Sequence, residues 1–115
     1  MNRKGFILIR EDDDLIRDLL ERWLGEAGYA VAETAIETPR LVIADVPTPS
    51  VAQPLIESLR AVYAAPILVL SARFRRGLGG SAEAARRLGV KKVLPKPFTR
   101  RELLAAVAEA LEGAE

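Results

Sequence analysis

Three short, almost uninterrupted apolar runs constrain the fold of this chain more than any other feature of its sequence. They cover residues 6–9 (FILI), 41–44 (LVIA) and 67–70 (ILVL), and β-branched side chains are frequent in them. Strands of a parallel sheet that is covered on both faces have this pattern, because both sides of each strand are buried. Residues 29–32 (YAVA) and 92–94 (KVL) are weaker strand candidates.

Helical patterns alternate with these runs. Between the first two strands, apolar residues recur at helical spacing over residues 15–24, and Asp13 and Gly28 are suited to cap the start and the end of that helix. The segment TRRE at residues 99–102 is a capping box, which predicts a terminal helix after it. One further helix is predicted to start at residue 51 or 54 and to end at residue 62. Another is predicted over residues 81–88.

The alternation of strands and helices predicts one mostly parallel sheet with helices on both faces. The interval between the second and third strands, residues 33–40, departs from this pattern. It is shorter than the dozen or more residues that a parallel crossover usually needs, and Pro39 interrupts it. We therefore expect a loop or a single turn there. The length of 115 residues is typical of one domain, so we expect residues 1–115 to form a single domain.

The composition narrows the possible chemistry. The chain has no cysteine and no histidine, which excludes disulfides, thiol catalysis, imidazole general-base chemistry and the usual zinc sites. The first apolar run is too short for a signal-peptide core or a membrane span. We therefore expect a cytoplasmic protein without a membrane partner.

The charges are unevenly distributed although the formal net charge is only +1. Between Arg73 and Arg101 almost every charged residue is basic, with Glu83 as the exception. This stretch is suited to an acidic partner surface, and ordinary solvated helix faces explain it equally well. It lacks the interleaved aromatic residues of a single-strand nucleic-acid site, so we expect no direct nucleic-acid binding.

Polar residues stand directly after four of the predicted strands. Glu11 and Asp12 follow the first, Asp45 the third, Ser71 the fourth and Lys96 the fifth. Ligands of open parallel sheets bind beyond the carboxyl ends of the strands, so these side chains should share one edge. Carboxylates, a hydroxyl and a lysine suit a hard divalent cation with an anion bound beside it. The pattern predicts phosphoryl transfer.

Each residue type has a plausible task in that chemistry. Glu11 or Asp12, together with Asp45, is suited to bind Mg²⁺, which prefers oxygen ligands and keeps several waters. Asp45 is the candidate nucleophile that forms an acyl phosphate. Lys96 supplies a positive charge and Ser71 a hydrogen bond to phosphoryl oxygens. A lysine buried at this edge would also need an acidic partner, for which Asp45 is the candidate.

The whole chain resembles the receiver domains of two-component response regulators. The resemblance rests on ILIREDD at residues 7–13, LVIAD at 41–45, PILVLSA at 66–72 and LPKPF at 94–98. It implies a flavodoxin-like, doubly wound, five-stranded parallel sheet in the order 2-1-3-4-5. In this chain the helix between the second and third strands would be shortened or missing. It also implies a cis peptide bond between Lys96 and Pro97.

The resemblance further implies a role for each candidate residue. Asp45 would accept a phosphoryl group from a histidine kinase or a phosphotransfer protein, and Ser71 would be the switch hydroxyl. Lys96 would bind the phosphoryl group, and Mg²⁺ would be the cofactor. The implied metal ligands are Glu11, Asp12, Asp45 and the backbone carbonyl of Pro47.

The resemblance also implies a regulatory domain rather than an enzyme, with self-catalysed phosphotransfer and dephosphorylation only. An output protein or domain would bind the Arg-rich segment and the last strand and helix, and a homodimer is a further expectation.

Asp13 and Asp14 are better explained as helix-capping and first-turn acids than as ligands.

Two positions depart from the receiver pattern. Pro47 stands where receivers use both a carbonyl and an N–H group, and proline has no N–H. Val93 occupies the position of the aromatic switch residue. These departures leave open a second function, that of a pseudo-receiver that binds proteins without phosphorylation. A flavin or nucleotide binder is a poor alternative, because no glycine-rich loop follows the first strand.

Overall fold

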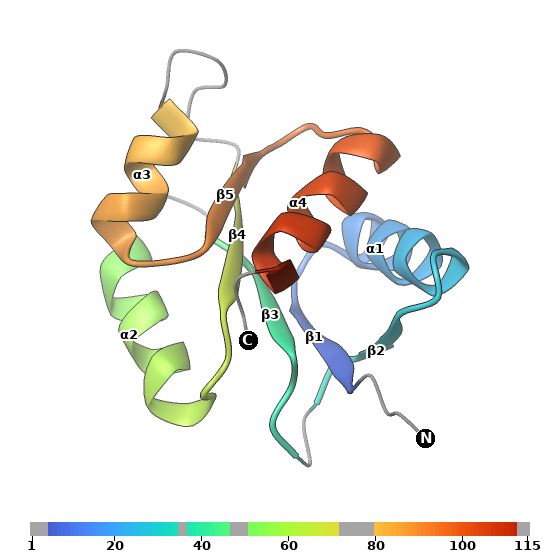
Figure 1. The fold of residues 1–115 in the computed structure, drawn as a ribbon, viewed down its shortest axis with the longest axis horizontal. Coiled ribbons are helices and arrows are strands. Elements are labelled where there is room, and N and C mark those ends of the chain that lie inside the picture. Colours follow the sequence, from blue (N-terminus) through green and yellow to red (C-terminus); the bar gives the residue numbers. More distant parts are fainter. Residues whose placement is uncertain (1–4, 35–36, 47–50, 72–79, 113–115) are drawn as a thin grey trace.

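The computed structural model describes residues 5–34, 37–46, 51–71 and 80–112, and for residues 80–82 and 84 it describes the backbone alone. Strands and helices alternate along these residues, except that the second strand is followed by the third (Figure 1). In chain order the elements are β1 (Phe6–Arg10), α1 (Asp14–Glu26), β2 (Ala30–Ala32), β3 (Leu41–Asp45), α2 (Ala52–Val62), β4 (Ile67–Ser71), α3 (Gly80–Leu88), β5 (Lys92–Pro95) and α4 (Arg100–Glu112).

The five strands form one parallel sheet in the order β2-β1-β3-β4-β5. Strand β2 therefore forms one edge of the sheet beside β1. After β2 the chain crosses to the other side of β1, where β3, β4 and β5 are added in sequence order. This order confirms the predicted 2-1-3-4-5 arrangement and the flavodoxin-like fold class.

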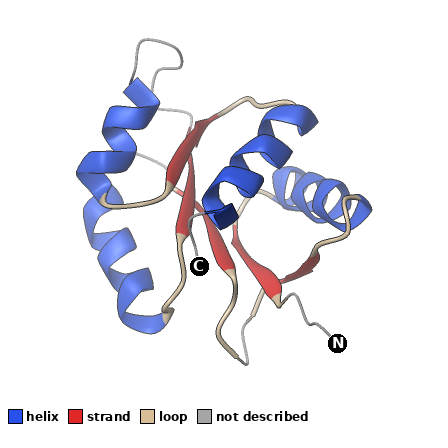
Figure 2. Cartoon of the chain, viewed as in Figure 1, coloured by secondary structure: helices blue, strands red, loops and turns tan. Residues whose placement is uncertain are grey.

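Helices cover both faces of the sheet, and the two faces have separate cores (Figure 2). On the α1 and α4 side, Ile7 and Ile9 of β1 pack with Leu20 of α1. On the α2 and α3 side, Leu8 of β1 packs with Ile56 of α2. Successive residues of one strand thus enter opposite cores, which explains why its sequence is apolar without alternation.

Helix α1 begins where its capping residue predicts. The Oδ1 atom of Asp13 accepts hydrogen bonds from the backbone N–H groups of Leu15 at 2.9 Å and Ile16 at 3.2 Å. After the helix ends, Gly28 adopts a φ of 97°, a left-handed conformation that strains any residue with a Cβ. Both predicted ends of this helix are confirmed.

The predicted capping box precedes α4. The backbone N–H of Glu102 donates to Thr99 Oγ1 at 3.0 Å, and the backbone N–H of Thr99 donates to Glu102 Oε1 at 2.9 Å. Helix α2 begins at Ala52, so that Pro54 lies in its first turn, where a missing N–H costs nothing.

The crossover from β2 to β3 has no helix in its described residues, 33–34 and 37–40. It forms bends and loop instead, and the backbone N–H of Arg40 donates to the carbonyl of Phe6 at 2.8 Å as the chain enters β3. The prediction of a loop or turn is confirmed for these described residues. On the α2 and α3 side, the helices therefore flank β3, β4 and β5, whereas β2 is a short edge strand (Figure 1).

A helix that crosses a bilayer needs about 20 predominantly apolar residues. None of the helices in the described ranges is long and apolar enough to cross a bilayer.

Candidate functional site

The carboxyl ends of β1, β3 and β5 bring two carboxylates to one ammonium group. Lys96 Nζ lies 2.7 Å from Asp45 Oδ1 and 3.2 Å from Glu11 Oε1. The side chains of Lys96 and Asp45 are 15% and 19% exposed, and that of Glu11 is 1% exposed. Three of the residues that the sequence analysis selected thus form one partly buried ion-pair cluster.

The end of β5 positions Lys96. In the sheet, Pro95 pairs with Ser71 of β4, and the backbone N–H of Lys96 then donates to the carbonyl of Ser71 at 2.9 Å. The peptide bond between Lys96 and Pro97 is cis, as the resemblance implied. The ammonium is therefore carried by a backbone segment that is bonded to the sheet.

Glu11 is held between β1 and the start of α1. Its Oε2 accepts a hydrogen bond from the backbone N–H of Asp13 at 3.1 Å. Its Oε1 is buried and accepts no well-directed hydrogen bond from the described residues, although it lies within ion-pair distance of Lys96. A buried carboxylate oxygen with unused acceptor capacity is costly unless a positive charge compensates it.

The protonation of Lys96 reflects two opposing effects. Burial lowers the pKa of the ammonium, whereas the hydrogen bond to Asp45 and the negative charges of Asp45 and Glu11 raise it. The carboxylates outweigh the burial, so the pKa of Lys96 lies above its ordinary value. Lys96 is therefore a fixed positive charge at neutral pH.

A cleft of about 580 Å³ opens beside this cluster. Glu11, Asp12 and Asp45 line it on the sheet side, and Val51 and Leu55 of the α2 segment line it on the other. Asp12 is exposed, so its carboxylate reaches solvent in the same cleft. The cleft therefore gives a small anion access to Asp45.

The donors in this cleft fit Mg²⁺. Within the described ranges, no three acidic side chains are close enough to form a complete metal site. Mg²⁺ does not need such a set, because it is usually bound through one or two carboxylates and keeps several waters. The buried Oε1 of Glu11, the exposed carboxylate of Asp12 and Asp45 supply oxygen ligands of the required kind. The implied fourth ligand, the carbonyl of Pro47, lies outside the described residues.

No protein-family model and no curated protein matches the chain. Solved structures do match. A response regulator receiver protein from Burkholderia phymatum is 24% identical, with 95% of this chain and 96% of that chain covered and a TM-score of 0.72. The chain has the receiver-domain fold.

Two further solved structures match with similar TM-scores. A sensor protein from Polaromonas is 25% identical, with 98% of this chain and 100% of that chain covered and a TM-score of 0.74. The receiver domain of a sensor histidine kinase from Pseudomonas aeruginosa is 23% identical, with 96% and 100% covered and a TM-score of 0.72. That structure contains a magnesium ion coordinated in the active-site cleft.

The remaining candidate residues take different places in the receiver fold. Ser71 ends β4 and is fully buried, and its backbone bonds that of Lys96. Val93 is 1% exposed and belongs to the core between the sheet and helices α2 and α3. Most of the Arg-rich segment, residues 72–79, lies outside the described residues.

Arg17 belongs to the site but was not predicted from the sequence. Its Nη1 donates to the backbone carbonyl of Glu11 at 2.9 Å, and the side chain forms ion pairs with Asp14 and with Glu33, the latter at 3.4 Å. The three-residue spacing from Asp14 is a recognisable helix signal. The contacts with Glu11 and Glu33 depend on the path of two loops, for which the sequence carries no signal.

Proposed function

We propose that this chain is a phosphoacceptor receiver domain of two-component signalling. Asp45 accepts a phosphoryl group from the phosphohistidine of a histidine kinase or a phosphotransfer protein, in a reaction that depends on Mg²⁺. The observation that carries this proposal is the cluster at the carboxyl edge of the sheet, in which Lys96 bonds Asp45 and contacts the buried Glu11 beside an open cleft.

The residues of the cluster divide the reaction between them. A carboxylate oxygen of Asp45 attacks phosphorus, the bond from phosphorus to the donor imidazole nitrogen breaks, and an acyl phosphate forms on Asp45. Lys96 is already 2.7 Å from Asp45 and balances the negative charge of the phosphoryl oxygens. Glu11 and Asp12, with Asp45, would hold Mg²⁺, which neutralises further charge on the phosphoryl group.

The proposed role is regulatory. The chain would act as a switch for a partner rather than as an enzyme with its own substrate, and its place of action would be the cytoplasm. The output surface would include β5, α4 and the exposed arginines of α3, Arg86 and Arg87. A homodimer is also part of the proposal.

A second function, that of a pseudo-receiver, is favoured by two sequence features. Pro47 removes a backbone donor from the segment after Asp45, and Val93 is a buried β-branched residue where receivers use an aromatic switch. Such a protein would keep the fold and bind its partner without phosphorylation.

Intact-mass measurement with acetyl phosphate distinguishes the two functions. A phosphoryl adduct that requires Mg²⁺ is expected for the unmodified protein, and a beryllofluoride adduct under the same conditions. Both should be lost in Asp45→Ala and retained in Glu57→Gln, which changes an exposed acid of α2 away from the cluster. If the unmodified protein forms neither adduct, the phosphoacceptor function is wrong and the pseudo-receiver is favoured.

A further inference from the structure

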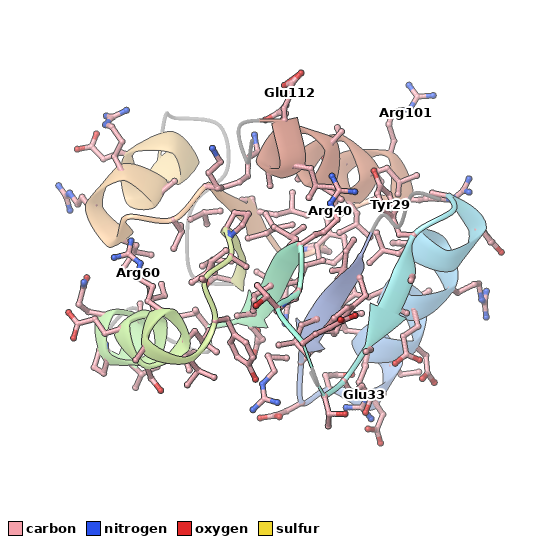
Figure 3. All side chains as sticks on the ribbon, turned by 60° about the horizontal axis from the view of Figure 1, so that its bottom comes forward. Tyr29, Glu33, Arg40, Arg60, Arg101 and Glu112 are labelled. Carbon is pink, nitrogen blue, oxygen red and sulfur yellow. The ribbon has the colours of Figure 1, made fainter. Side chains whose placement is uncertain are left out.

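Arg17 connects three segments that are separate in the sequence. It binds the carbonyl of Glu11 in the loop after β1, the carboxylate of Asp14 in the first turn of α1, and the carboxylate of Glu33 just after β2. The Arg17 side chain is 25% exposed and lines the same cleft as Asp45. Figure 3 labels Glu33, which directly follows β2.

The bond to the Glu11 carbonyl is the contact that matters for the site. A peptide unit is planar, so holding this carbonyl fixes the plane that joins residue 11 to residue 12. The two candidate metal ligands, Glu11 and Asp12, leave the chain at the two ends of that plane. A charge-assisted hydrogen bond from a guanidinium to this oxygen thus constrains the direction of both carboxylates.

The other contacts orient the guanidinium. Asp14 and Glu33 are largely exposed, so each ion pair alone contributes little stability. Together they occupy the nitrogens that do not face Glu11, and they leave Nη1 for the carbonyl. Glu33 also shares a hydrogen bond with Glu21, and this bond raises the pKa of Glu21. Lysine cannot replace this arrangement, because it lacks the planar fork of donors.

We propose that Arg17 is a positioning residue for the acidic pair Glu11 and Asp12, and that Glu33, in the crossover between β2 and β3, orients Arg17. The inference rests on the proposed function, since it assigns Arg17 a role in preparing the Mg²⁺ site. The crossover thereby takes part in the site through Glu33, although none of its residues is a candidate ligand.

The direction in which the Mg²⁺ affinity changes when Arg17 is removed distinguishes a positioning role from a purely electrostatic one. Removing a positive charge near a cation site would by itself tighten the binding of Mg²⁺. If Arg17 positions the ligands, its removal weakens Mg²⁺ binding instead. Loss of a residue that orients metal ligands typically reduces metal affinity by about 10-fold or more.

The test is a Mg²⁺ titration of the full chain without any phosphodonor. Trp23 shares an apolar pocket with Lys96 and Phe98, so its fluorescence is a suitable signal. Arg17→Met should bind Mg²⁺ about 10-fold more weakly than the unmodified protein. The matched control is Arg22→Met, which removes an exposed arginine of the same helix and should leave the affinity unchanged. Equal or tighter binding by Arg17→Met would overturn the proposal.

Arg17→Lys is the second variant and decides the question if Arg17→Met does not fold. It keeps the charge, so electrostatics predicts no change in Mg²⁺ affinity, whereas loss of the fork of donors predicts weaker Mg²⁺ binding than in the unmodified protein. Unchanged affinity in Arg17→Lys would overturn the positioning role. If the unmodified protein binds no Mg²⁺ and forms no beryllofluoride adduct, the proposed function itself fails and the positioning role fails with it. If the unmodified protein binds Mg²⁺ and forms the beryllofluoride adduct, unchanged Mg²⁺ affinity in the Arg17 variants refutes only the positioning role of Arg17 and leaves the proposed function intact.

Discussion

At the scale of single residues, the shared ammonium of Lys96 organises the site. Two carboxylates that approach one another are repelled unless a positive charge lies between them, and Lys96 contacts both Asp45 and Glu11. Because the Glu11 side chain is 1% exposed, water cannot replace the lysine. The cluster is therefore a structural element as well as a candidate reaction centre.

Replacing Lys96 by methionine should destabilise the fold by about 3 kcal/mol at neutral pH, because it leaves the buried Glu11 without its cation. The pKa of Lys96 is raised in the folded protein, so its ion pairs contribute fully below the ordinary lysine value of 10.5 and are lost as the pH rises through the higher folded value. Urea unfolding at neutral and alkaline pH measures both effects. The difference between the unmodified protein and Lys96→Met should shrink above pH 10.5. A constant difference would contradict this assignment.

At the scale of elements, the acids after β1 serve two purposes. Glu11 and Asp12 face the cleft, whereas Asp13 caps α1 through hydrogen bonds to Leu15 and Ile16. A run of four acidic residues is therefore divided between the candidate metal site and the positive end of a helix dipole. This division follows from helix geometry, which allows the capping side chain to reach only the first free N–H groups.

Asp13→Ala should lower the free energy of unfolding by about 1 kcal/mol, because α1 loses its cap. Its backbone N–H remains and still donates to Glu11, so the Mg²⁺-dependent adduct on Asp45 should form as before. Urea unfolding and intact-mass analysis measure the two properties, with Asp18→Ala as the exposed control in the same helix. Loss of the adduct in a variant of near-normal stability would show that Asp13 acts in the metal site.

The elements were largely predictable from the sequence, and the reasons are local. Strand positions follow from apolar runs that two cores require, and the ends of α1 and α4 follow from Asp13 and the capping box at Thr99. The contact between Lys96 and Asp45 was also predictable, because two strand ends share an edge of the sheet. The role of Arg17 was not, since its partner Glu33 lies in a connection whose path depends on the whole fold.

At the scale of the whole molecule, the strands of the sheet differ in how many neighbouring strands they pair with and in how deeply they are buried. The three central strands β1, β3 and β4 are paired on both edges, and their inward residues are almost fully buried. Strand β2 has only three residues, pairs with β1 alone and is followed by a crossover without a helix in residues 33–34 and 37–40. Local opening should therefore begin at β2 rather than at the centre.

Native-state hydrogen exchange tests this difference. Amides of β1, β3 and β4 should exchange only by global unfolding, whereas those of β2 should exchange through local opening at a lower free energy. The amides of β5, the other edge strand, are the internal comparison, because α3 and α4 both pack against β5. Equal protection of β2 and β3 would mean that the sheet opens as one unit.

The short crossover between β2 and β3 also has a consequence for protein engineering. The entropy of closing a loop grows only with the logarithm of its length, so doubling the eight residues of 33–40 would cost about 0.6 kcal/mol. Glu37 and Thr38 are exposed and lie beyond Glu33, so a peptide inserted between them would keep the contact with Arg17. A reporter tag can therefore be inserted between Glu37 and Thr38 without a change to Asp45.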